Sequence, residues 1–117
     1  MDGFGLPSQI VKRAKEIGRT SIALTDHGSV SGYVQLMKAC KEQGIKPVYG
    51  YEAYIVPSLR TMFDEKIREK SHITILASNM EGYRNVLKLA SLAYQQGFYY
   101  RPTIDSEMLF QNNSGLI

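Results

Sequence analysis

Four side chains of metal-binding type stand beside or within predicted strands. Asp26 and His27 directly follow the apolar segment 21–25, and Glu52 lies in a segment rich in valine, tyrosine and isoleucine. His72 opens a further apolar segment. Carboxylates and imidazoles are suitable ligands for zinc, manganese or magnesium, and three or more must converge to form a closed site. These residue types are therefore compatible with a divalent-metal site, whereas their spacing alone does not establish convergence.

Each of these residues also has a purely structural interpretation. Asp26 could accept backbone N–H groups at the start of the following helix. Glu52 could lie on an exposed strand edge, and His72 could be an ordinary histidine with satisfied hydrogen bonds. Asp2 beside a glycine is typical of a turn or a chain end. Taken singly, none of them identifies an enzyme.

An aromatic and basic segment stands near the C-terminus. Tyr99, Tyr100 and Arg101 follow Phe98 there. Aromatic faces beside a guanidinium group suit single-stranded nucleic acid, because bases stack on the rings and phosphates bind the cation. The alternative is that these aromatic residues pack the loop onto the core. We take Arg101, Tyr99 and Tyr100 as weak candidates for nucleic-acid contact.

Hydrophobic periodicity predicts alternating helices and strands. Helices are expected over 7–17, 30–43 and 81–96, with a short one over 104–110; strands are expected over 21–25, 46–56 and 72–77, and the opening of another at 115–117. The polar segment 58–71 reads as a loop or short surface helix, and 98–102 as an aromatic loop. This alternation predicts an α/β fold with parallel strands whose C-terminal ends share one edge.

Finer expectations concern the first strand and second helix. The strand 21–25 reads as buried on both faces, because it is short and apolar. Ser29 is a candidate N-cap for helix 30–43, with Val34, Met37 and Cys40 on one face and a C-terminal stop at Gly44.

Composition limits the possible classes of protein. The chain has 117 residues, 13.2 kDa and a net charge of +3, which suit one modest domain and permit an anionic partner. A single cysteine excludes an intramolecular disulfide. Apolar runs fall far short of the roughly 20 residues that span a bilayer, and no secretory signal opens the chain. These features predict a cytoplasmic location without membrane contact.

Several motifs together resemble the polymerase and histidinol phosphatase (PHP) domain, in the form found at the N-terminus of bacterial replicative DNA polymerase III alpha subunits. The resemblance covers nearly the whole chain, in the right order and spacing. Its motifs are IALTDHG at 22–28, GIKPVYGYEAY at 44–54, HITILASN at 72–79, GYRNVLKL at 82–89 and GFYYRP at 97–102.

The resemblance implies a distorted (β/α)7 TIM-like barrel with a cluster of divalent metals (zinc, manganese or magnesium), used for phosphoester hydrolysis in active members. It further implies that Asp2, His27, Glu52 and His72 are metal ligands. Asp26 would orient His27 or cap the helix. In a polymerase parent, DNA and deoxynucleoside triphosphates would be substrates, and magnesium would serve a polymerase site outside this chain. A proofreading exonuclease subunit and other replisome subunits would be partners.

The family pattern is incomplete in this sequence. The His-x-His motif expected before Asp2 and the ligands expected beyond Ile117 are missing, so we expect a single partial PHP domain over 1–117, truncated at both ends and inactive when isolated. Within the parent, this domain would be a metal-dependent phosphatase or proofreading exonuclease, or a metal-poor docking scaffold. The alternatives are a stand-alone PHP phosphoesterase, such as a histidinol-phosphatase-like enzyme, and a non-catalytic split-gene module that depends on a partner.

Overall fold

The computed structural model describes residues 5–117. Helices and strands alternate through most of the chain. In order they are α1 (Pro7–Glu16), β1 (Ser21–Leu24), α2 (Tyr33–Gln43), β2 (Lys46–Val56), α3 (Leu59–Asp64), β3 (Ser71–Leu76), α4 (Met80–Gln96), β4 (Phe98–Tyr99), β5 (Arg101–Asp105) and α5 (Ser106–Gln111). The periodicity therefore located most elements but missed β4 and β5, and the helix predicted over 104–110 starts only at Ser106. The prediction of a mixed α/β fold is confirmed.

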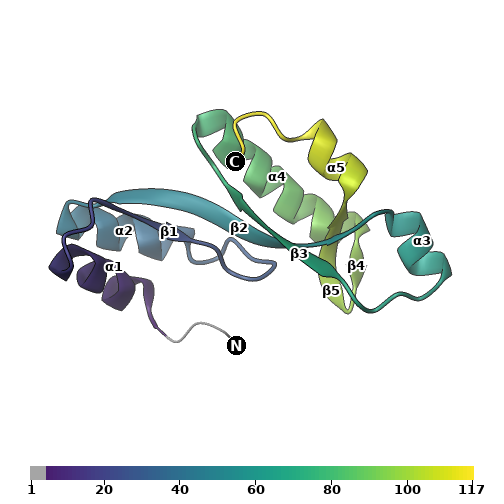
Figure 1. The fold of residues 1–117 in the computed structure, drawn as a ribbon, viewed down its shortest axis with the longest axis horizontal. Coiled ribbons are helices and arrows are strands. Elements are labelled where there is room, and N and C mark those ends of the chain that lie inside the picture. The colour runs from purple at the N-terminus through teal and green to yellow at the C-terminus, as the bar shows by residue number, and fades with distance from the viewer. Residues whose placement is uncertain (1–4) are drawn as a thin grey trace.

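The long strand β2 connects the two ends of the molecule (Figure 1). Its first residues pair with β1 in parallel, with Ala23 opposite Val48. Its last residues pair with β5, also in parallel, with Ile55 opposite Ile104. Helices α1 and α2 lie around the first half of β2, and α4, α5 and α3 lie around the second half (Figure 1). Every other element is thus arranged along this one strand.

The expectation that all strands run parallel is wrong for β3. This strand pairs with β2 in antiparallel orientation over six positions, from Gly50 opposite Leu76 to Ile55 opposite Ser71. The reason lies in the connection between the two strands. Its helix α3 packs with Val56 at the end of the sheet and does not cross a sheet face, so the chain turns back beside β2. The start of β3 consequently lies beside the C-terminal half of β2.

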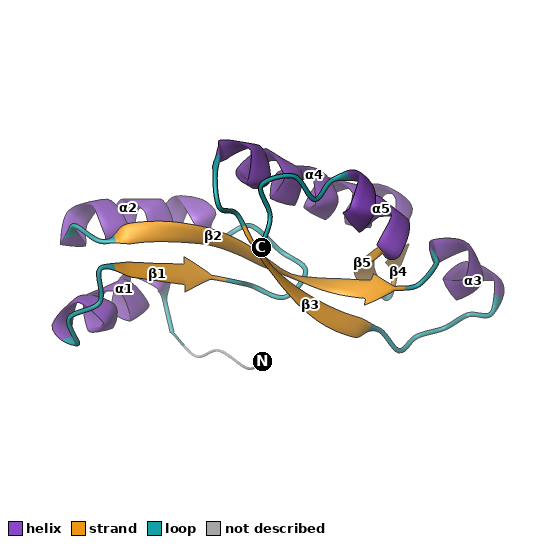
Figure 2. Cartoon of the chain, turned by 45° about the horizontal axis from the view of Figure 1, so that its top comes forward, coloured by secondary structure: helices purple, strands orange, loops and turns teal. Residues whose placement is uncertain are grey.

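Two apolar clusters stabilise the two halves of the chain. Helix α4 lies against one face of β2 and β3, where Val86, Leu89 and Ala93 are fully buried against Tyr51 and Ile75 (Figure 2). At the other end of β2, α1 and α2 share a cluster with β1 and the start of β2. The predicted helix 81–96 is confirmed, and its periodic apolar face is the one that packs on the sheet.

The first strand and the second helix differ in detail from expectation. Strand β1 is not buried on both faces: its residues alternate between exposed and half-buried, because it pairs only with β2 among the described residues.

Helix α2 starts at Tyr33 with Gly32 as its N-cap, later than predicted, so Ser29 does not cap it. Val34 and Met37 are exposed, and the buried face carries Leu36, Ala39 and Cys40 instead. Gly44 ends the helix in the left-handed conformation as expected.

The segment predicted as an aromatic loop is a tight hairpin. Strands β4 and β5 pair antiparallel around Tyr100, with Tyr99 opposite Arg101. Asp105 ends β5 and caps α5, accepting a hydrogen bond from the Met108 backbone N–H at 3.0 Å. At the end of the chain, Ile117 exchanges two backbone hydrogen bonds with Leu76 of β3, which agrees with the predicted opening of a strand.

The described chain is elongated, with extents of 49 × 29 × 19 Å. Its radius of gyration of 15.3 Å exceeds the roughly 13 Å typical of a compact domain of this length. This shape is that of an open, curved layer of strands with helices. Among residues 5–117, no helix has both the length and the apolar character needed to cross a membrane.

Candidate metal centre

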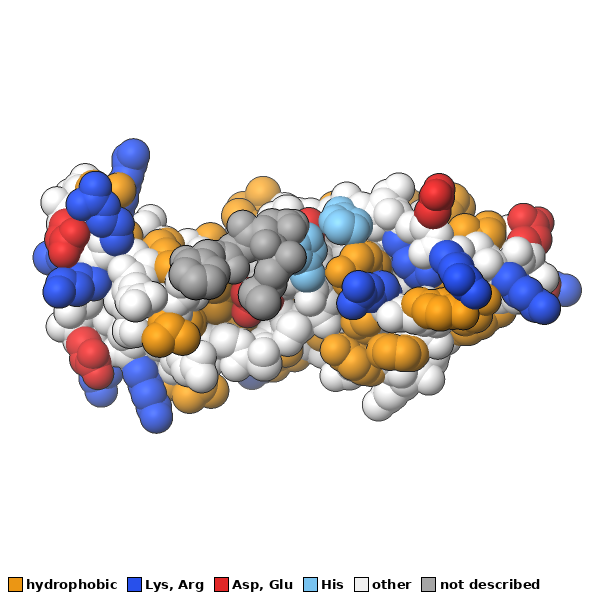
Figure 3. Space-filling view, turned by 90° about the horizontal axis from the view of Figure 1, so that it is seen from below, with side chains coloured by type: hydrophobic (Ala, Val, Ile, Leu, Met, Phe, Trp, Pro, Cys, Tyr) orange, Lys and Arg blue, Asp and Glu red, His pale blue; other side chains and the backbone are white. Residues whose placement is uncertain are grey.

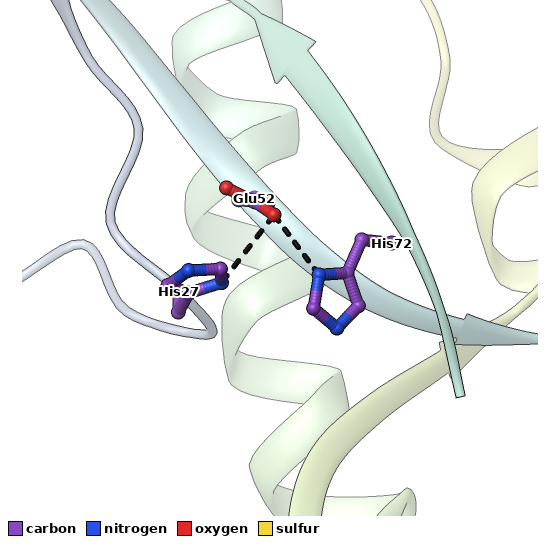
Figure 4. A group of neighbouring side chains, drawn as sticks. All are labelled: His27, Glu52 and His72. Carbon is purple, nitrogen blue, oxygen red and sulfur yellow. Dashed lines mark hydrogen bonds and ion pairs between the residues drawn. The ribbon is translucent and has the colours of Figure 1, made fainter. Parts of the chain in front are cut away.

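The structure brings three of the predicted ligands together on the face of β2 that lies opposite α4. Glu52 Oε1 lies 3.0 Å from His72 Nδ1 and 3.4 Å from His27 Nδ1 (Figure 4). One potential ligand atom from each side chain lies within 4.8 Å of the other two. The carboxylate is about three-quarters shielded from solvent, and the two rings border it at the surface. The three side chains thus form one compact cluster.

Backbone pairing explains why His27 reaches Glu52. Beyond the end of β1, the chain continues beside β2, and His27 forms an isolated parallel bridge with Glu52. The Glu52 N–H donates to the carbonyl of Asp26 at 3.2 Å, and the Gly28 N–H donates to the carbonyl of Glu52 at 2.9 Å. These bonds fix the position of the loop that carries His27 along the strand that carries Glu52.

The antiparallel register explains why His72 joins them. Residue His72 pairs with Tyr54, two positions along β2 from Glu52. Residues two apart on a strand point to the same face, and diagonal neighbours in antiparallel strands are within reach of long side chains. The strand start that carries His72 therefore meets the middle of β2. A parallel β3 would have placed this histidine elsewhere.

Gly28 is required by the close packing around this loop. Its φ of +60° lies in the left-handed region that favours glycine. A Cβ atom on it would lie 3.0 Å from Pro102 Cγ and 3.1 Å from the Tyr54 ring. A side chain at this position would push apart the loop carrying His27, the β4–β5 hairpin and the ring that contacts both histidines.

Tyr54 is a site residue that the sequence reasoning missed. Its ring stacks on His27 with centroids 6.2 Å apart and meets the His72 ring edge-on at 4.8 Å. The guanidinium of Arg101 lies 6.0 Å from the centre of the same ring. Strand alternation contained the signal, because Tyr54 stands two residues after Glu52 and must share its face. The ring limits the orientations open to both imidazoles.

The donor set of the cluster fits a divalent cation. Two imidazole nitrogens and a carboxylate oxygen are ligands for zinc or manganese. Bonds of about 2.1 Å to one ion would separate such atoms by roughly 3.4 Å in tetrahedral geometry, which is close to the two distances to Glu52 Oε1. An ion here would replace the two contacts to Glu52 with metal bonds, and its other positions would be open to water, substrate or additional ligands.

The remaining predicted residues occupy different places. Asp2 lies outside the described residues. Asp26 contacts the site through its backbone carbonyl, which accepts the hydrogen bond from the Glu52 N–H. Its carboxylate lies beside Gly32 at the start of α2, where an added Cβ would come within 2.9 Å of one carboxylate oxygen. Arg101 reaches the site through Tyr54, whereas Tyr99 and Tyr100 lie further along the hairpin.

Two buried tyrosines lie on the opposite face of the sheet, Tyr33 from α2 and Tyr51 from β2 itself. The Tyr33 hydroxyl donates to the carbonyl of Gly50 at 2.6 Å, and burial, with the neighbouring Tyr83, raises the pKa of Tyr33 well above its usual value. Burial raises the pKa of Tyr51 to about 12. The Tyr51 hydroxyl has no hydrogen-bond partner within the described part of the chain. Neither hydroxyl faces the histidine cluster.

The fold and the site together define a mixed α/β protein with a His/Glu cluster on the open face of its sheet. The PHP domain model matches residues 1–117, and the chain belongs to the PHP domain family.

Curated relatives share the same domain. The DNA polymerase III subunit alpha of Chlamydia trachomatis is 46% identical over 113 residues, which cover 93% of this chain and 9% of that protein. Those of Treponema pallidum and Helicobacter pylori are 40% and 37% identical, each over all of this chain and 10% of the relative. The chain therefore spans about a tenth of the length of these relatives.

Solved structures show the same fold. A protein from Bifidobacterium adolescentis, assigned as a metal-dependent phosphoesterase, matches with a TM-score of 0.51 and 21% identity, over 82% of this chain and 32% of that one. An amidohydrolase from Chromobacterium violaceum, solved with bound sulfate and no metal, matches with a TM-score of 0.51 and 22% identity, over 82% and 33% of the two chains.

Proposed function

We propose that this chain is part of the metal-binding PHP domain of a DNA polymerase III alpha subunit. His27, Glu52 and His72 are its ligands. The main observation in favour is that both histidines contact Glu52 Oε1, although the three residues come from separate segments. The sequence identity of 37–47% to DNA polymerase III alpha subunits along the chain supports the proposal that the chain belongs to such a subunit. In the longer chain, Asp2 and residues outside this sequence complete the metal cluster and the TIM-like barrel.

The chemistry that suits this centre is phosphoester hydrolysis. A divalent ion of zinc, manganese or magnesium type, when bound, activates water and offsets charge on the phosphate. This chain would contribute ligand geometry: Glu52 between two histidines, each ring held against Tyr54. Asp26 would hold the His27 loop to β2 through its backbone. Exposure of both rings leaves one side of the cluster accessible to a phosphate group.

The sequence identity to DNA polymerase III alpha subunits also suggests the activity of the full-length polypeptide. DNA synthesis from deoxynucleoside triphosphates would take place at a magnesium-dependent site elsewhere in the polypeptide. Its partners would be DNA, other replisome subunits and a proofreading exonuclease subunit, and its location cytoplasmic. We expect the 117-residue chain alone to show no hydrolysis, because it supplies only part of the ligand set.

The test uses the polymerase polypeptide that contains this sequence. We would compare the wild type with a His27→Ala and Glu52→Ala double variant, measuring bound metal by mass spectrometry and release of nucleotides from a labelled oligonucleotide. Glu42→Ala, on the exposed surface of α2, is the matched control. We expect the double variant alone to lose metal and hydrolysis, while primer extension continues. Undiminished metal content in the double variant would disprove the ligand assignment.

A metal-poor docking scaffold is the alternative that this experiment separates. In that case the wild-type polypeptide would contain no stoichiometric metal, and the double variant would behave like the wild type.

A further inference from the structure

Three aromatic rings form a closed triangle at the histidine cluster. The Tyr54 ring centre lies 6.2 Å from that of His27, with the planes 24° apart, and 4.8 Å from that of His72, with the planes 89° apart. The two imidazole rings complete the triangle at 5.4 Å. On the face seen in Figure 3, histidine side chains reach the surface, and hydrophobic side chains, the class that includes tyrosine, adjoin them. Each imidazole is therefore bounded by two other rings as well as by Glu52.

The backbone of Tyr54 is paired on both sides. Tyr54 lies opposite His72 on β3 and opposite Thr103 on β5, so β2 is an interior strand at this residue. Backbone that is paired on both sides opens less readily than sheet edges or loops. The Tyr54 side chain therefore projects from a fixed point, on the face that it shares with Glu52 two residues earlier.

The Tyr54 ring is also held by the loop and the hairpin around it. A Cβ atom on Gly28 would lie 3.1 Å from a carbon of the ring, and the guanidinium of Arg101 stands 6.0 Å from the ring centre. The hairpin is itself attached to the segment before β3, because Arg68 packs 4.5 Å from the centre of the Tyr100 ring. Protein packing thus fixes the Tyr54 ring against both imidazoles.

We propose that Tyr54 is a positioning residue that makes the histidine cluster selective for a four-coordinate ion such as zinc over a six-coordinate ion such as manganese. Its ring would hold both imidazoles in the orientation for metal binding and occupy space beside them that additional ligands need. This inference rests on the proposed function, because it concerns the choice of metal at the same centre.

The orientation of the imidazoles matters more for zinc than for manganese. A bond from a metal to an imidazole nitrogen lies in the plane of the ring, so a tilted ring binds less well. Zinc readily takes nitrogen ligands in a tetrahedral arrangement, whereas manganese suits carboxylates, carbonyls and water. Loss of a side chain that orients the imidazoles should therefore weaken zinc binding more than manganese binding.

The number of ligands favours zinc in the same way. Two imidazoles and one carboxylate leave one position of a tetrahedral ion for water or substrate, but three positions of an octahedral ion. The environment around the ligands controls how easily water reaches those positions. A ring that fills the space beside both imidazoles consequently favours the smaller coordination number.

Metal affinities of the 117-residue chain test the proposal. Zinc and manganese binding would be measured by competition with a chromophoric chelator in the wild type, Tyr54→Leu and Tyr54→Phe. Leucine keeps apolar bulk without a flat ring, whereas phenylalanine keeps the ring. Tyr94→Leu is the matched control, because it removes a ring that is 55% exposed on α4.

The expected result is a change in the ratio of the two affinities. Tyr54→Leu should bind zinc about tenfold more weakly and manganese less than about threefold more weakly. Tyr54→Phe and Tyr94→Leu should stay within about twofold of the wild type for both ions. A ring with only a structural role would lower the thermal stability of the metal-free chain and leave the zinc-to-manganese ratio unchanged, and this result would contradict the proposal. Equal losses in Tyr54→Phe and Tyr54→Leu would also contradict it.

Cobalt provides a spectroscopic measure of the coordination number. Four-coordinate cobalt(II) absorbs visible light far more strongly than six-coordinate cobalt(II). We expect strong absorption from the wild type, Tyr54→Phe and Tyr94→Leu, and a weaker band from Tyr54→Leu at saturating cobalt. Weak absorption from the wild type, or an unchanged band from Tyr54→Leu, would overturn the proposal.

The inference and the proposed function fail in different ways. If Glu52→Gln binds zinc as tightly as the wild type, the cluster is not a metal centre and both are disproved. If Glu52→Gln loses zinc and Tyr54→Leu does not, the metal centre stands and only the role of Tyr54 is disproved.

Discussion

The two faces of strand β2 differ sharply although they share one backbone. Tyr51 and Ala53 point into the apolar cluster under α4 and are fully buried. Glu52 and Tyr54, which alternate with them, lie on the other face beside two partly exposed histidines. The buried face supplies stability and the open face supplies chemical groups. Residues next to each other in sequence should therefore respond very differently to substitution.

The largest effect on stability should come from the buried face. Leu89 of α4 is fully buried against the sheet, so Leu89→Ala removes apolar contacts and leaves a cavity. We expect a loss of about 2–5 kcal/mol in the free energy of unfolding, measured with urea. His72→Ala on the open face should cost much less, because the ring is 44% exposed. Equal costs for the two substitutions would remove the distinction between the faces.

High pH should weaken the buried face selectively. Burial raises the pKa of Tyr51 to about 12, so the hydroxyl stays protonated when folded and ionises in the unfolded chain near pH 10. Its contribution is intact below that pH and is lost as pH rises from 10 to 12, at about 1 kcal/mol per unit. Tyr51→Phe should make urea stability fall less steeply over this range. An unchanged slope would contradict the burial of this hydroxyl.

Tyr33 provides a smaller effect on the same face. Its hydroxyl donates to the carbonyl of Gly50, so Tyr33→Phe breaks a buried hydrogen bond. We expect a loss of about 1 kcal/mol at neutral pH, measured by urea unfolding. Tyr51→Phe is the matched comparison, since the Tyr51 hydroxyl has no partner among the described residues. A larger loss of unfolding free energy for Tyr51→Phe than for Tyr33→Phe would contradict the assignment of the buried hydrogen bond to Tyr33.

The smallest effect on stability should come from Glu52. Its contacts with His27 and His72 lie at a partly exposed surface, where ion pairs contribute roughly 0–1 kcal/mol. Glu52→Gln should therefore change urea stability by about 0.5 kcal/mol without metal. Zinc should then stabilise the wild type and not the variant. If both are stabilised equally by zinc, the ion binds elsewhere.

Sequence periodicity predicted the helices and strands because most of them have one apolar side. Strand direction was not predictable in the same way. The segment between β2 and β3 was long enough to cross the sheet, and only the packing of α3 against Val56 shows that it does not. The buried face of α2 was also misassigned, since the helix starts at Tyr33 and its apolar residues are spread around it.

The site was more predictable in its residue types than in its geometry. His27, Glu52 and His72 stood out because they follow, interrupt or open apolar strands, and the family motifs implied that all three are metal ligands. Their meeting depends on an antiparallel register and a parallel bridge that no local pattern encodes. Tyr54 could have been found by strand alternation, whereas the contact of Arg68 with Tyr100 joins separate segments and required the fold.

The most direct test of the metal centre uses the fact that the chain has two histidines. Their imidazole signals in the NMR spectrum of the 117-residue chain can be followed during titration with zinc, in the wild type, Glu52→Gln and the surface control Glu42→Gln. We predict that both signals shift together at one equivalent of zinc in the wild type and control, and that Glu52→Gln needs about tenfold more zinc or does not respond. If only one histidine shifts, or if Glu52→Gln responds like the wild type, His27, Glu52 and His72 do not form a shared metal site.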